Sequence, residues 1–142
     1  MIGMGTLPPV IALAGWTMVM WLWMYATRIP AINAAQVVPD ELGRDPTVTL
    51  DAILPPQVQW KAHNYNHLHE APTVFYAVAI VLAIIGQGDG LNAQIAWAYV
   101  VLRVIHSLVQ VTANRVMARF AVFALSTLCL MALVGRAALQ MI

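Results

Sequence analysis

The stretch that decides the fold reads LRVIHSLVQVTANRVMARF and runs from Leu102 to Phe120. Its polar side chains Arg103, His106 and Gln110 recur at helical spacing. The segment before it, 93–102, is apolar enough to lie in a bilayer, so Arg103 is expected well inside a membrane span. An arginine at mid-bilayer is unfavourable by roughly 2.5–3.5 kcal/mol, so it rarely faces lipid and is usually paired. This polar stripe is therefore a candidate functional site.

The composition is that of a membrane protein. Of the 142 residues, 61% are hydrophobic and only 9% are charged, whereas roughly a quarter of the residues in soluble domains are charged. The net charge of +1 gives no reason to expect nucleic-acid binding. The single cysteine, Cys129, lies in an apolar run and is interpreted as a packing residue, so no disulfide can form within the chain.

Four apolar segments predict an all-α fold, a four-helix transmembrane bundle that forms one domain over residues 1–142. At ~1.5 Å per residue, about 20 residues cross the ~30 Å hydrocarbon core. The apolar run from Glu70 to Ile85 is too short alone, so its helix is expected to begin near Gln57 and to carry polar residues into the membrane boundary. The expected spans are about 7–27, 57–86, 91–114 and 118–140.

The distribution of lysine and arginine predicts the orientation. The long loop 27–56 and the short turn near 114–119 lie on one side, with the first turn of the second helix. Their basic residues are Arg28, Arg44, Lys61, Arg115 and Arg119. The other side has only Arg136, so the positive-inside rule places the long loop and the short turn in the cytoplasm and both termini outside.

Polar residues of the second and third spans are expected at matching depths. Glu70 lies 16 residues before Gly86 and His106 lies 15 after Leu91. Asn66 and Gln110 form a second pair of equal depth by the same count. Such a network either holds the helices together or lines a pocket for a polar ligand.

Arg103 is expected to form an ion pair with Glu70. It lies about 6 Å from the depth of Glu70, at ~1.5 Å per residue, which an extended arginine side chain can reach. Such a pair would reduce the cost of burying both charges.

The run HNYNHLHE (63–70) also contains a possible metal pair. His63 and His67 have i, i+4 spacing, with Glu70 near them. His69 falls on a different helix face and no second metal motif is present, so no metal site is predicted.

Two motifs make the chain resemble the MAPEG superfamily, the membrane-associated proteins in eicosanoid and glutathione metabolism, in their prokaryotic form. The run KAHNYNHLHEAP (61–72) is similar to the family's second-helix pattern. The run RVIHSLVQVTANRVMARF (103–120) is similar to its third-to-fourth-helix pattern and is the stronger match.

The resemblance implies a homotrimer that binds glutathione between neighbouring subunits at the cytoplasmic side. Asn66 and Glu70 would then hold the tripeptide's polar groups, and Arg115 would bind a carboxylate. Arg119 would be catalytic and stabilise the thiolate, because a thiol of pKa ~8.5 is mostly protonated at neutral pH. The full set of implied glutathione-binding residues is Lys61, Asn66, Glu70, Arg103, His106, Gln110 and Arg115.

The chain departs from the family pattern in places. Gln110 and Phe123 stand where the family often has tyrosines, and Lys61 replaces an arginine, which removes bidentate carboxylate binding. The usual Glu-x-x-Pro is shortened to Glu70-Ala-Pro72, so that His69 occupies the aligned glutamate position.

The expected function is a glutathione-dependent transferase or peroxidase in a membrane, here a bacterial inner membrane, acting on an apolar electrophile or lipid hydroperoxide that arrives through the lipid. One alternative is a non-enzymatic member of the same fold that binds a lipid or a partner protein in the groove between subunits. Another is a small channel or transporter that uses Glu70, Arg103 and His106 as a relay.

Overall fold

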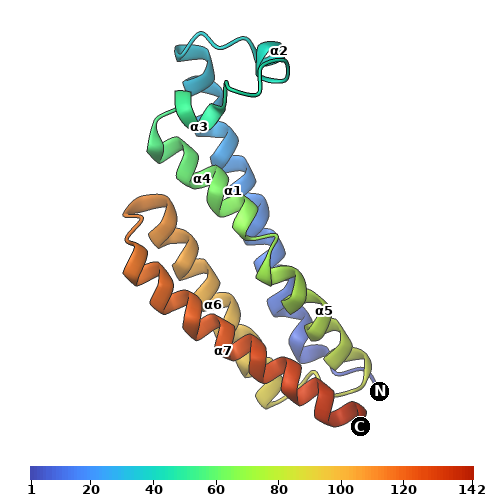
Figure 1. Ribbon diagram of the computed structural model, residues 1–142. Coiled ribbons are helices and arrows are strands. Elements are labelled where there is room, and N and C mark those ends of the chain that lie inside the picture. Colours follow the sequence, from blue (N-terminus) through green and yellow to red (C-terminus); the bar gives the residue numbers. More distant parts are fainter.

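The computed structural model describes all 142 residues, and it is built of helices joined by turns and short loops (Figure 1). The elements are η1 (Met4–Thr6), α1 (Leu7–Ala34), α2 (Pro39–Leu42), α3 (Leu50–Ile53), α4 (Pro56–His67), α5 (Ala71–Ile84), α6 (Leu91–Thr112) and α7 (Val116–Met141). Four stretches are long and apolar enough to cross a membrane: Met4–Ala34, Pro56–Ile84, Leu91–Thr112 and Val116–Met141. The predicted all-α, four-helix transmembrane bundle is therefore confirmed.

The bundle consists of two packed helix pairs. α6 and α7 form a hairpin, α1 packs against α4, and α5 packs against α7. Figure 1 shows both chain termini at the end of the bundle where α5 finishes, while α2 and α3 lie at the opposite end. The long loop between α1 and α4 thus lies at the end to which the α6–α7 turn also points.

The core is narrow and the outer surface is apolar. Leu13, Met20 and Leu133 are fully buried, and the rings of Phe75 and Tyr99 stack with their centroids 4.5 Å apart. Large apolar side chains project outward from every long helix, including Ile11, Leu22, Ile80, Val101, Leu128 and Met131. Such a surface suits contact with lipid chains, because a helix satisfies its backbone hydrogen bonds internally.

The α6–α7 turn positions the start of α7. Asn114 has a positive φ of 46°, and its N–H donates to the carbonyl of Val109 at 2.7 Å. Asn114 thus follows the end of α6 with a positive φ, which asparagine tolerates better than most residues. Arg115 is the N-cap of α7, and Arg119 follows one turn later on the same helix.

The N-terminal segment is fastened to α5 and the loop after it. Thr6 Oγ1 donates to the carbonyl of Ala79 at 2.8 Å, and the N–H of Gly3 donates to that of Ala83 at 2.8 Å. A Cβ placed on Gly88 would lie 2.1 Å from the carbonyl oxygen of Gly3, so this approach requires glycine. These contacts set the position of α1 beside α5.

Candidate functional site

A cavity of about 300 Å³ opens between α4, α6 and α7. Its wall combines histidines, a carboxylate, an amide and a guanidinium with apolar side chains from α7. The lining residues are His63, His67, Glu70, His106, Gln110, Val116, Arg119, Phe120 and Phe123. A pocket with a few convergent polar groups beside apolar walls is the usual form of a small-molecule site.

Pro72 shapes one side of this cavity by breaking the second span. In an uninterrupted helix the N–H of residue 72 would bond the carbonyl of Leu68, but proline has no N–H and its ring clashes with that carbonyl. α4 therefore ends at His67 and α5 begins at Ala71, with Glu70 at ψ −102° between them. The break allows Glu70 to turn back onto the last residue of α4.

Glu70 and His67 form the closest contact between ionisable side chains in the cavity wall. Glu70 Oε2 lies 2.9 Å from His67 Nδ1. The imidazole ring of His67 also lies near the His106 imidazole and the Phe123 phenyl ring, whose centroids are 5.0 and 5.8 Å away. The ring is thus oriented by one carboxylate and two neighbouring rings.

The expected ion pair between Glu70 and Arg103 is not formed, because Glu70 turns toward His67 instead. Arg103 is only 1% exposed, and its guanidinium carbon lies 5.8 Å from the centroid of the Phe123 ring. Its Nε and Nη2 atoms have no hydrogen-bond partner. A buried guanidinium with free donors next to a cavity is suited to attract an anionic group.

The asparagine of α4 that contacts α6 is Asn64 and not the expected Asn66. Asn66 is exposed, whereas Asn64 is fully buried and accepts a hydrogen bond from the Ser107 hydroxyl at 3.0 Å. Two residues correspond to roughly 200° around a helix, so matching depth did not determine which asparagine faces α6. Gln110 does line the cavity, and its Oε1 has no hydrogen-bond partner.

Arg119 lies in the cavity wall, on the first turns of α7. Its Nη1 donates to Asn114 Oδ1, which ties the guanidinium to the α6–α7 turn. Arg115, by contrast, is exposed and is not part of the wall. Within one chain, only Arg119 of these two arginines borders the cavity.

The Lys61 side chain points toward α1 and not toward the cavity. Its Nζ donates to the carbonyl of Gln57 at 3.0 Å and lies 5.4 Å from the centroid of the Trp23 ring on α1. The ammonium group therefore packs between α4 and α1, outside the cavity wall of its own chain.

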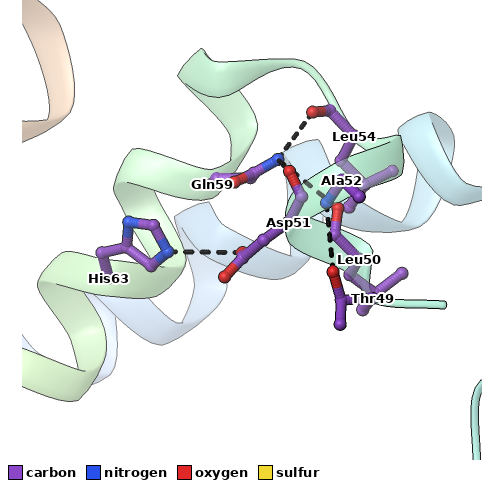
Figure 2. Close-up of polar contacts among 7 residues, drawn as sticks. All are labelled: Thr49, Leu50, Asp51, Ala52, Leu54, Gln59 and His63. Carbon is purple, nitrogen blue, oxygen red and sulfur yellow. Dashed lines mark hydrogen bonds and ion pairs between the residues drawn. The ribbon is translucent and has the colours of Figure 1, made fainter. Parts of the chain in front are cut away.

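The long loop is attached to the same wall (Figure 2). Gln59 Nε2 donates to the carbonyls of Asp51 and Leu54 at 2.6 and 2.7 Å. Asp51 Oδ1 lies 3.3 Å from Nε2 of His63, one of the lining residues. The loop end of the site is thus held to α4 by an amide and a histidine.

Four of the eight predicted site residues lie together in the wall: Glu70, His106, Gln110 and Arg119. His63 and His67 also line it, although the sequence raised them only as a possible metal pair. Their i, i+4 spacing placed them on one face of α4, which was the available signal. The apolar side chains Val116, Phe120 and Phe123 had no such signal, because they resemble ordinary membrane-span residues.

Fold and cavity together define an integral, multi-pass membrane protein with a partly polar cavity between its helices. The chain belongs to the MAPEG family, because the family model described as "MAPEG family" matches residues 6–139, nearly the whole chain. No curated protein and no solved structure matches it. Membership makes the chain a membrane protein of the type that serves glutathione and eicosanoid metabolism, and the family is associated with glutathione use.

Proposed function

We propose that the chain is a glutathione-dependent transferase or peroxidase that binds the thiol in the cavity between α4, α6 and α7. The observation that carries the proposal is the position of Arg119 in the wall of this cavity, beside Glu70, His106 and Gln110. A guanidinium next to a bound thiol favours the thiolate, which is the nucleophilic form. A cavity of about 300 Å³ is at the small end of ligand sites.

The second substrate would be apolar and would arrive through the lipid. Val116, Phe120 and Phe123 give the α7 side of the cavity an apolar surface. An electrophile or lipid hydroperoxide partitions into the bilayer and could meet the thiolate at this side. In a transferase step the sulfur forms a bond to the electrophilic carbon as the leaving group departs. In a peroxidase step two thiols are oxidised to a disulfide while the hydroperoxide is reduced to alcohol and water.

The assembly that fits this proposal is a homotrimer with glutathione between neighbouring subunits. Lys61, Asn66, Arg103 and Arg115 do not line the cavity of their own chain. Asn66 and Arg115 are exposed, so they are accessible to a ligand that extends onto an adjacent chain. We further propose that the α2–α3 loop and the α6–α7 turn face the cytoplasm of a bacterial inner membrane, in keeping with the positive-inside rule.

A non-enzymatic role is the second candidate. Gln110 and Phe123 present no hydroxyl group to the cavity, so a ligand there lacks the contacts that tyrosines would provide. The same wall, with its three apolar residues from α7, would accept a lipid headgroup region together with the start of an acyl chain.

The experiment is an ultraviolet difference spectrum of the purified protein with glutathione, at about 240 nm, where thiolates absorb. The wild type is expected to give a thiolate signal that Arg119→Ala loses or greatly reduces. Arg44→Ala is the matched control, because Arg44 is exposed in the loop between α2 and α3 and is not in the cavity wall. A wild type that neither binds nor ionises glutathione would leave the lipid- or partner-binding role as the better account.

A further inference from the structure

We propose that His67, oriented by Glu70, is the base that takes the proton from the thiol bound in the cavity. This inference rests on the proposed function, since it concerns how the thiolate beside Arg119 is generated. Arg119 can stabilise the product of ionisation, but a guanidinium that is already protonated cannot accept the proton. The site therefore needs an acceptor within reach of the sulfur.

The contact with Glu70 leaves the outer nitrogen of His67 available. A carboxylate can only accept a hydrogen bond, so the 2.9 Å contact between Glu70 Oε2 and His67 Nδ1 assigns the proton to Nδ1. Nε2 then carries a lone pair, and it forms no hydrogen bond within the protein. A base held in one tautomer by a carboxylate is the arrangement that general-base histidines use.

His67 is better placed for this role than the other cavity histidines. His63 Nε2 is occupied by the Asp51 carboxylate at 3.3 Å. His106 is 3% exposed, and its Nδ1 has no partner, so no carboxylate selects its tautomer. Of the two wall histidines with a carboxylate partner, His67 has the shorter contact, 2.9 Å against 3.3 Å for His63, and the less exposed side chain, 25% exposed against 49%.

The proposed step balances within the site. The S–H bond of the thiol breaks, its electron pair stays on sulfur, and a new N–H bond forms at His67 Nε2. The thiolate lies beside the Arg119 guanidinium, and the imidazolium forms against the Glu70 carboxylate. After the sulfur attacks the electrophile, the proton on Nε2 passes to the leaving group or to solvent and restores the base.

Several charged groups lie near His67. Glu70 lies in the break after α4, Arg103 and His106 come from α6, and Arg119 comes from α7. The imidazolium thus forms between one carboxylate and two guanidiniums, with the tilted ring of His106 beside it. The thiolate that forms with it adds a negative charge to the same cavity.

The test follows thiolate formation and proton release together after rapid mixing of lipid-embedded protein with glutathione. Absorbance at about 240 nm reports the thiolate, and an indicator dye in weakly buffered solution reports protons. The wild type should form thiolate without releasing an equal number of protons, because His67 retains them. In His67→Gln each thiolate should release a proton to the medium, and its formation should be about 100-fold slower.

His69→Gln is the control, because His69 is exposed, bonds the carbonyl of Tyr65 and is not in the cavity wall. It should behave as the wild type does. Glu70→Gln should also slow ionisation, because a side-chain amide can donate to Nδ1 and so select the wrong tautomer.

Binding of S-methylglutathione, which has no thiol, shows whether a variant keeps its pocket. If His67→Gln forms thiolate at the wild-type rate and with wild-type proton release, His67 is not the base. The proposal that Arg119 stabilises the thiolate would then still stand. If His67→Gln does not bind the analogue, the rate of thiolate formation is measured in Glu70→Gln instead. A wild-type rate in Glu70→Gln would overturn the inference. A wild type without any binding or thiolate signal would instead reject the proposed function.

Discussion

Asn64 and Asn66 lie two residues apart on α4 and have opposite surroundings. Asn64 is fully buried and holds the hydroxyl of Ser107 on α6, whereas Asn66 is exposed. The hydrogen bond between Ser107 and Asn64 is the direct side-chain link between α6 and α4. A buried hydroxyl that loses its acceptor keeps its full desolvation penalty.

Asn64→Ala should therefore lower the free energy of unfolding by about 1–3 kcal/mol. Asn66→Ala should change it by less than about 0.5 kcal/mol, as surface substitutions do. Unfolding by denaturing detergent, followed by circular dichroism, measures both variants. Equal loss of stability in the two variants would contradict the assignment of Asn64 to the α6 contact.

The sequence could predict that polar residues of the second and third spans meet, but not which of them. Asn66 and Gln110 were matched by counting residues from the 86–90 turn, whereas the hydrogen bond that forms joins Asn64, 22 residues before Gly86, to Ser107, 16 after Leu91. The helix face depends on where α4 starts and on the break before Pro72, and a two-residue difference reverses the side. The same limit explains Arg103, whose expected partner Glu70 pairs with His67 instead.

Arg103 is a buried charge without a charged partner in its own chain, which indicates that a ligand provides that partner. It is nearly fully buried, its free donors have no protein partner, and its guanidinium lies near the Phe123 ring. Burying an unpaired charge is costly, and bundles retain such residues where they serve a ligand or a pathway. In the proposed account an anionic group of glutathione provides the missing charge.

At the scale of elements, the break between α4 and α5 matters most for the site. The sequence predicted a single second span, and its length and polarity required a start near Gln57. It did not predict that the span is interrupted at residues 68–70, although Pro72 was the signal for this. That interruption is what turns Glu70 back to His67.

The loop end of the site depends on Gln59, which holds α3 against α4. Its amide donates to the carbonyls of Asp51 and Leu54, and a third carbonyl, that of Leu50, lies 3.4 Å away. These carbonyls belong to the first two residues of the four-residue helix α3 and to its C-cap residue, Leu54. Such short helices do not persist alone in water.

Gln59→Ala should release this loop, so that added protease cleaves within 43–55 about 10-fold faster, which corresponds to the loss of about 1–1.5 kcal/mol of hydrogen bonding. Gln57→Ala is the matched control, because the Gln57 side chain is exposed and makes no hydrogen bond. The rate of cleavage is measured by mass spectrometry of the fragments. If both variants are cleaved at the wild-type rate, Gln59 does not hold the loop.

At the scale of the whole molecule, many of the large apolar side chains are exposed on the outside. The four-helix architecture and its membrane character followed from composition and from the length of the apolar runs, which depend on the bilayer alone. The site did not follow as fully, because it depends on a helix break and on helix phase. Half of the predicted site residues line the cavity, and the proposed trimer would bring the exposed Asn66 and Arg115 to a shared ligand.

The central claim is that glutathione occupies the cavity between α4, α6 and α7 with its sulfur beside Arg119. The most direct test is a crystal structure grown in lipid with glutathione sulfonate, in which a charged sulfonate replaces the thiolate. The sulfonate should lie against the Arg119 guanidinium and within reach of His67 Nε2, with the peptide part extending toward a neighbouring chain. An acyl chain in the cavity, or a glutathione sulfonate bound away from Arg119, would contradict the claim.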